Sequence, residues 1–381
     1  MNVEWKESIR KKCKYAKKFS KNPTQENCEL KNKWRNIATK CRRKAIKQYW
    51  RRKTDDFNNN PAEFYKTFKP FLDDKSRAVD KCITLEKDGN VIRDQSKIAD
   101  CFLDYFSSVA KGIGDIKLLE LNEEQFKSHT SVQRIHEYKK VVNAPQFQFE
   151  RLHCEEITKA LKELNVRKGM GHDRVPNSIL RLGSEELAPS LTTIYNNCID
   201  ACYWPSEWKK GEWTPVYKKD NVYEVKNYRP VTLLPACDKV FEKLLSQQVT
   251  AFIEPRLSRN LTAYRKRHST ETSLIKLTEN WKRAIDDRNI VGILSTDMSK
   301  AFDSLHPPLL LSKLDAYGFS TSSKGLLRSY FTERKYRVKI GTEITSEWKE
   351  VLRGCPQGST FGSLLWNTFQ NDLNIFANEN N

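Results

Sequence analysis

Residues 293–303, which we call the deciding stretch, read Ile293-Leu294-Ser295-Thr296-Asp297-Met298-Ser299-Lys300-Ala301-Phe302-Asp303 and are the most informative segment of the sequence. The apolar run 290–294 leads into it and predicts a buried β-strand, which would place Asp297 at the carboxyl end of that strand. A carboxylate is a hard oxygen ligand of the kind Mg²⁺ prefers, and paired Mg²⁺ ions can carry phosphoryl transfer. A single aspartate cannot hold two ions, and an aspartate after a strand is more often a turn or helix cap. The stretch alone therefore predicts a strand and leaves the role of Asp297 open.

Helical and strand-like patterns alternate on both sides of this stretch. Before it, apolar spacing predicts helices at 189–202, 238–253 and 269–286 and strands at 213–217 and 229–234. After it, a hairpin of residues 336–340 and 346–351 leads into the loop Gly354-Cys355-Pro356-Gln357-Gly358. Near the start of the chain, Asp88-Gly89 between two apolar runs predicts another hairpin at 83–92. Because the alternation has no regular period, we expect an α+β fold rather than a doubly wound sheet.

The positive charge of the chain is concentrated at its start. Of the net charge of +19, a surplus of 15 lies in residues 1–53, which hold 19 lysines and arginines against four glutamates. From Cys28 to Arg52, apolar residues recur three or four positions apart, which predicts a long basic amphipathic helix. Such a helix is typical of proteins that bind nucleic acid through its phosphates, although a solvated helix face or a leader is the alternative. The candidate contacts are Arg42, Arg43, Lys44, Lys47, Arg51, Arg52 and Lys53.

Membrane, secreted and zinc-binding proteins find little support in the sequence. No apolar run approaches the roughly 18 residues of a membrane span, and the first residues lack the apolar stretch of a secretory signal. We therefore expect an intracellular protein without a membrane partner, in the nucleus or the cytoplasm. The ten cysteines are dispersed, and no pair has the two-residue gap of a zinc knuckle.

Short motifs follow one another in a fixed order through the second half of the chain. They are Lys168 with Gly171 and Asp173; Pro176-Asn177; Asn227-Tyr228-Arg229-Pro230 with Leu233-Leu234; Lys239 with Glu242-Lys243; Tyr264-Arg265 with Ser269-Thr270; residues 297–303; and Pro356-Gln357-Gly358-Ser359 with Gly362 and Leu364-Leu365. In this order they resemble the reverse transcriptases of non-long-terminal-repeat (LINE-type, jockey-like) retrotransposons. The likeness runs from about Lys168 to the end of the chain. A weaker likeness, to the basic linker of such elements, covers residues 25–110.

The resemblance implies roles for the residues of the deciding stretch. Asp297 would be the first catalytic metal ligand, and the backbone carbonyl of Met298 a second donor. Phe302 would lie under the sugar of a nucleotide, where its ring leaves no room for a 2′-hydroxyl; ordinary core packing is the alternative. An RNA-directed RNA polymerase would place an aspartate at that position. Because the aspartate here is one residue later, at Asp303, the resemblance favours a polymerase that makes DNA.

The resemblance also implies residues that would hold the template and the nucleotide. Gln357 and Gly358 match the loop that lies against both, where glycine permits close backbone approach and the glutamine amide can donate and accept. Lys218 and Arg229 match the two strands whose basic side chains hold the triphosphate. Lys219 is the alternative to Lys218, and a surface role is the alternative for each cation.

The implied architecture is the fingers and part of the palm of a right-hand polymerase, preceded by a basic helical region. We expect a basic helical linker region at 1–110, a connection at 111–150, fingers at 151–288 and a partial palm at 289–381. The implied function is RNA-directed DNA polymerisation, with two Mg²⁺ ions in a complete enzyme. The implied partners are an RNA template, a DNA primer and deoxynucleoside triphosphates.

One part of the family pattern is missing from these residues. The paired aspartates that follow the Gln357 segment in such enzymes, in the form Tyr or Phe followed by Ala-Asp-Asp, do not occur before Asn381. A thumb is not evident either. We therefore expect this chain by itself not to polymerise DNA. The alternative function is that of a non-catalytic nucleic-acid-binding remnant of a retroelement.

Overall fold

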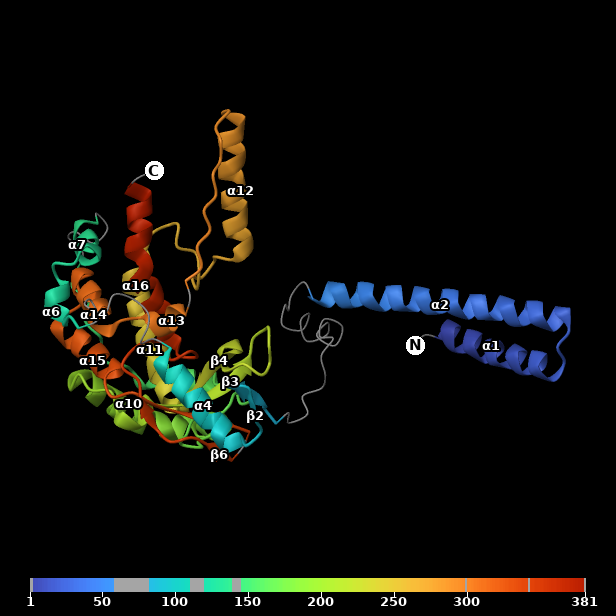
Figure 1. Ribbon diagram of the computed structural model, residues 1–381, viewed down its shortest axis with the longest axis horizontal. Helices are drawn as coiled ribbons and strands as arrows, with labels where there is room; N and C mark the ends of the chain where they lie inside the picture. Colours follow the sequence, from blue (N-terminus) through green and yellow to red (C-terminus); the bar gives the residue numbers. More distant parts are fainter. Residues whose placement is uncertain are drawn as a thin grey trace. The chain divides into compact units, whose positions relative to one another are not determined.

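The computed structural model describes residues 3–57, 82–109, 120–138, 145–298, 300–341 and 343–379 (Figure 1). It divides the chain into two compact units, Met1–Lys81 and Cys82–Asn381. Much of the connection expected at 111–150 lies outside the described residues.

The first unit contains a hairpin of two helices, α1 (Val3–Lys21) and α2 (Gln25–Phe57). The rings of Tyr15 and Trp34 stack with centroids 6.1 Å apart, and Lys44 pairs with Glu4 at 3.4 Å, so the two helices run antiparallel. The helix expected from Cys28 to Arg52 is confirmed within α2. Helix α1 was not predicted from the sequence.

The second unit is built on a mixed β-sheet. Its strands follow the order β4 (Tyr228–Leu233), β3 (Lys210–Tyr217), β5 (Lys335–Ile340) and β6 (Ile344–Thr345), and β7 (Lys349–Glu350) also pairs with β5. Strand β3 is antiparallel to β4 and parallel to β5. The strands expected at 213–217 and 229–234 are confirmed, and so is the hairpin that begins near residue 336.

Helix α4 (Gln95–Ser108) packs on one face of this sheet. Its Phe102 lies edge-on to Tyr228, with centroids 4.9 Å apart, and its Phe106 lies edge-on to Trp213 at 5.7 Å. The hairpin expected at 83–92 is confirmed as β1 (Leu85–Lys87) and β2 (Asn90–Ile92). We expected one region to span residues 1–110. The structure instead divides the chain between residues 81 and 82, because the apolar side of α4 is buried against the sheet.

Helices form the larger core of the second unit. They are α8 (Cys154–Lys162), α10 (Ser184–Asp200), α11 (Ala236–Ile253), α14 (Pro307–Ala316), α15 (Thr321–Phe331) and α16 (Thr360–Glu379), with the shorter α6 (Glu123–Phe126), α7 (Thr130–Glu137) and α9 (Asn177–Leu182) beside them. Trp204, Tyr195, Tyr330 and Phe241 are completely buried in this core. Helices and a mostly antiparallel sheet in one unit make the fold α+β, as predicted.

Residues 270–298, which we call the arm, pack little against the rest of this unit (the light orange segment of Figure 1). Helix α12 (Thr270–Asp286) begins after its N-cap Ser269, as predicted, and none of its residues is buried. The buried strand expected at 290–294 is wrong. The segment has no regular structure, and Ile290 and Leu294 are 98% and 91% exposed. A strand needs a neighbouring strand to pair its backbone groups, and the described residues place none beside this segment.

Candidate functional site

A groove of about 510 Å³ lies between the end of α4, the β3–β4 hairpin and the residues around Lys300. Seven residues of this unit were predicted to belong to a site, and six of them line the groove: Lys218, Arg229, Asp297, Met298, Phe302 and Gln357. They come from three segments that are far apart in the sequence. The fold therefore brings together the residues that the motifs had singled out.

Asp297 and Met298 reach the groove at the end of the arm. Both are exposed, and Asp297 does not stand at the tip of a paired strand as expected, because residues 290–298 have no regular secondary structure. Lys300 has a left-handed backbone, with φ of 58°, and turns the chain into the short helix α13 (Ala301–Ser304). This turn places Asp297 and Phe302 on the same groove.

Phe302 lies on α13 and is half-buried. Its ring centroid is 5.9 Å from that of Tyr264 and 6.0 Å from that of Trp366 on α16. Phe302 and Tyr264 both line the groove. Phe302 therefore packs against a core helix and also lines the groove, and its role toward a nucleotide stays a prediction.

The basic side of the groove comes from the β3–β4 hairpin. Lys218 follows β3, and its backbone N–H donates to the carbonyl of Asn227 at 2.8 Å; Arg229 lies on β4 opposite Val216. Lys226 and Lys300 also line the groove, which gives it four cations against the carboxylates of Asp297 and Asp303. Lys218 is among the lining residues and Lys219 is not, which favours the register chosen from the sequence.

The loop 354–359 is fixed to the deciding stretch and to β4 through its backbone. The N–H of Cys355 donates to the carbonyl of Phe302 at 3.0 Å, and the N–H of Thr232 donates to the carbonyl of Gln357 at 2.8 Å. Gly358 has φ of 131°, and a Cβ there would lie 2.8 Å from the carbonyl oxygen of Thr232. Only glycine fits this approach. Gly358 thus supports the groove through its backbone and does not line it.

Asp303 is a groove residue to which the sequence gave no role in a site. Both of its carboxylate oxygens lie 3.3 Å from Nε2 of Gln357, and it lines the groove together with that glutamine. Burial raises the pKa of the Asp303 carboxyl above its ordinary value, while the hydrogen bond from Gln357 and the nearby charge of Lys300 oppose that shift. Its position at the end of the Ala301-Phe302-Asp303 motif was the signal that could have identified it.

The buried carboxylate of Glu242 holds the end of the loop 354–359 through hydrogen bonds. Glu242 on α11 is completely buried, and it accepts hydrogen bonds from the hydroxyl of Tyr330 at 2.9 Å and the N–H of Thr360 at 2.7 Å. The hydroxyl of Ser359 lies 2.9 Å from both of its oxygens. Burial raises the pKa of Glu242, and the buried Arg334 guanidinium opposes that shift. Because Glu242 caps the first turn of α16, it also fixes where the Gln357 loop ends and the helix begins.

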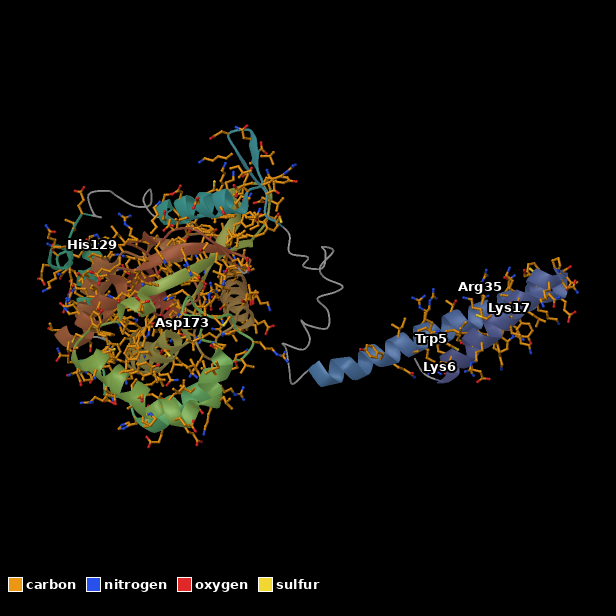
Figure 2. All side chains as sticks on the ribbon, turned by 90° about the horizontal axis from the view of Figure 1, so that it is seen from below. Trp5, Lys6, Lys17, Arg35, His129 and Asp173 are labelled. Atoms are coloured by element: carbon orange, nitrogen blue, oxygen red, sulfur yellow. The ribbon has the colours of Figure 1, made fainter. Side chains whose placement is uncertain are left out.

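The basic residues predicted on α2 belong to the first unit. The side chains of Arg42, Arg43, Lys44 and Lys47 are exposed on α2. The side chains of Arg51, Arg52 and Lys53 lie outside the described residues, although their backbone is helical. Figure 2 shows the side chains of Lys6 and Lys17 on α1 and of Arg35 on α2 projecting from the hairpin. The cations of α1 were counted in the basic surplus of residues 1–53, but the helix that carries them was not predicted.

Two further findings concern metals and membranes. Among the described residues, no three His, Cys, Asp or Glu side chains come together as a ready metal cluster. No described helix is long and apolar enough to cross a membrane.

Comparison with known proteins shows which family this part of the chain is similar to. Residues 216–379 match the family described as reverse transcriptase (RNA-dependent DNA polymerase). The probable RNA-directed DNA polymerase from transposon BS of Drosophila melanogaster is 30% identical over 226 residues, which cover 58% of this chain and 25% of that protein. The RNA-directed DNA polymerase from mobile element jockey of the same fly is 26% identical over 222 residues, covering 58% and 24%. The chain thus spans about a quarter of the length of these curated relatives.

Residues 216–379, the region that matches the reverse transcriptase family, hold the whole predicted set of groove residues. The relatives that the chain matches are the polymerases of transposable elements such as jockey, which agrees with the predicted resemblance to non-long-terminal-repeat retrotransposons.

Proposed function

We propose that the groove is the nucleotide site of a retrotransposon RNA-directed DNA polymerase. In this proposal residues 151–288 form the fingers and residues 289–381 part of the palm. The observation that carries it is the meeting of Lys218, Arg229, Asp297, Phe302 and Gln357 on one groove. Phosphoryl transfer needs positioning and charge stabilisation more than covalent chemistry, and these residue types supply both.

The cations of the β3–β4 hairpin would bind the triphosphate. The guanidinium of Arg229 can donate two parallel hydrogen bonds to phosphate oxygens, and Lys218 adds a mobile point charge. Both side chains are exposed on the rim of the groove, so a ligand can reach them without a change in the fold. Phe302 would face the sugar, where its ring excludes a 2′-hydroxyl by contact.

The donors at the end of the arm fit magnesium. The carboxylate of Asp297 and the backbone carbonyl of Met298 are hard oxygen ligands, and Mg²⁺ is commonly held by one or two carboxylates together with water and substrate phosphates. When bound, the metal would lower the pKa of the attacking hydroxyl and stabilise charge on the leaving oxygen. Asp303 is engaged by Gln357 and does not supply a second free carboxylate to this end of the groove.

A binding titration tests the nucleotide site. The full chain, titrated with a fluorescent deoxynucleoside triphosphate in Mg²⁺, is expected to bind it, and Arg229→Ala should weaken binding about tenfold or more through loss of charge-assisted hydrogen bonds. Arg181→Ala removes an exposed arginine that does not line the groove and should leave affinity unchanged. Equal losses in the two variants, or no binding by the unaltered chain, would contradict the proposal.

The same preparation addresses catalysis. We expect residues 1–381 to bind nucleotide without extending a primer, because two ions need more carboxylates than Asp297 supplies in this groove. Robust Mg²⁺-dependent primer extension by the purified chain would overturn that expectation.

The helical hairpin of the first unit would bind the RNA template and DNA primer through their phosphates. Its exposed cations, Arg42, Arg43, Lys44 and Lys47 among them, support this assignment. The second candidate function is nucleic-acid binding without catalysis, which rests on the same hairpin. It predicts that the chain binds RNA but no nucleoside triphosphate, so the titration above separates the two.

A further inference from the structure

The side chains of Asp303 and Gln357 form a pair within the groove. Gln357 Nε2 lies 3.3 Å from both Oδ1 and Oδ2 of Asp303, so one amide nitrogen is shared between the two carboxylate oxygens. The two residues are 54 positions apart, and both line the groove that holds Asp297 and Arg229. Their pairing therefore depends on the tertiary structure and lies inside the proposed nucleotide site.

The backbone around this pair is fixed on both sides. Gly354 has φ of 84°, and a Cβ at that position would lie 3.0 Å from Cα of Asp303, so the loop is pressed against α13. The carbonyl of Gln357 is held by the N–H of Thr232, and Ser359 is held by Glu242. With both backbones fixed, the freedom left to Gln357 lies in its side-chain torsions, and the contact of Nε2 with Asp303 restricts them.

The chemistry of the two side chains decides that rotation. An ionised carboxylate can only accept hydrogen bonds, whereas a glutamine amide has a donor end and an acceptor end. The nitrogen end must therefore face Asp303. The oxygen end, Oε1, is then left to accept a hydrogen bond from a ligand in the groove.

We infer that Asp303 is a positioning residue that sets the polarity of Gln357, so that the groove presents a hydrogen-bond acceptor to a donor group of the nucleotide. This inference rests on the proposed nucleotide site and adds to it a residue that need not touch the ligand. Asp303 acts through Gln357. Its effect on the ligand should vanish when Gln357 is removed.

The first test reads the orientation of the amide directly and needs no ligand. In the full chain labelled with ¹⁵N-glutamine, the side-chain signal of Gln357 is the one missing from Gln357→Ala. Asp303→Ala should move this signal toward that of a solvent-exposed glutamine. Asp303→Asn, whose Oδ1 still accepts, should leave it near its original position. An unmoved signal in Asp303→Ala overturns the inference.

The second test is a double-mutant cycle on affinity for a fluorescent deoxynucleoside triphosphate. Asp303→Ala and Gln357→Ala should each weaken binding about tenfold, while Asp303→Asn stays near twofold. The double variant should lose about tenfold as well, because the two residues act as one unit. Multiplied losses in the double variant would mean that Asp303 acts independently of Gln357, and would overturn the inference.

One control variant distinguishes the positioning role of Asp303 from a general effect on folding. One combination of results distinguishes this role from the proposed function. Asp200→Asn alters a remote exposed carboxylate that pairs with Arg151, and it should change neither the amide signal nor the affinity. If the amide signal responds to Asp303→Ala but the unaltered chain binds no nucleotide, the positioning role stands and the proposed nucleotide site fails.

Discussion

His306 shows how burial changes the protonation of a side chain in this fold. It precedes α14, is 8% exposed, and lies edge-on to Phe126 with ring centroids 5.4 Å apart. Neither ring nitrogen has a hydrogen-bond partner among the described residues. Burial lowers the pKa of His306 to about 4, and the charge of Arg353 acts in the same direction. The imidazole is therefore neutral in the folded chain at pH 7.

This shift predicts a loss of stability in acid. Between pH 6.5 and about 4 the unfolded chain binds a proton at His306 that the folded chain excludes, so the free energy of unfolding should fall as the pH is lowered through that window. The expected contribution of this one group is about 1 to 3 kcal/mol. Urea unfolding at pH 7.5 and pH 5 measures it. His306→Phe should remove this part of the pH dependence, whereas His136→Gln, at an exposed histidine, should retain it.

The residues of the groove differ in how far sequence could identify them. Asp297, Phe302 and Gln357 belong to motifs with a fixed order. The order of these motifs was enough to predict that the three residues belong to one site, and all three line the groove. The role of Asp303 could not be predicted, because it depends on a partner 54 positions away and on two backbones that hold the pair together. Glu242 was visible as part of a motif, but its capping of α16 follows only from the packing of α11 below the loop.

At the scale of elements, the arm is the main departure from expectation. The apolar run 290–294 has the composition of a buried strand, yet Ile290 and Leu294 are almost fully exposed. The composition of a segment predicts whether it can form a strand. It does not predict whether another strand lies alongside to pair with it. The helix before it formed as predicted, because a helix satisfies its own backbone hydrogen bonds and a strand does not.

Substitutions in the arm test its lack of packing. Leu294→Lys replaces a residue that is 91% exposed and should change the free energy of unfolding by no more than about 0.5 kcal/mol. Leu314→Ala, at a residue of α14 that is completely buried, should cost about 2 to 5 kcal/mol. Chemical denaturation of the two variants gives the comparison. A loss above about 2 kcal/mol in Leu294→Lys would show that the arm is packed in solution.

At the scale of the whole molecule, the basic surplus and the main hydrophobic core lie in different units of the chain. The first unit is a two-helix hairpin with a large basic surplus, and the second contains the sheet, the helical core and the groove. The basic surface and the groove therefore lie in separate compact units. The first suits contact with phosphates without regard to base sequence.

The salt dependence of RNA binding tests the role of the hairpin. Each phosphate contact to single-stranded RNA adds about 0.7 to the slope of log affinity against log salt concentration. Replacing Arg42, Arg43, Lys44 and Lys47 together by glutamine should lower that slope by up to about 3 and weaken binding at low salt. A control variant removes the same charge from the second unit by changing Lys127, Lys159, Lys162 and Lys282 to glutamine. Equal effects of the two variants would show that net charge alone, and not the hairpin, controls the affinity.

The amino-acid sequence was enough to predict the α+β class, the positions of most helices and strands, the basic region and the motif residues of the groove. These follow from local periodicity, turn chemistry and motif order, which are properties of neighbouring residues. Only the tertiary structure decided that α4 covers the sheet, that residues 290–294 stay unpaired, and that Asp303 and Glu242 fix the Gln357 loop. Each of these depends on which distant segment lies alongside, and burial and hydrogen bonding between distant segments are properties of the folded chain alone.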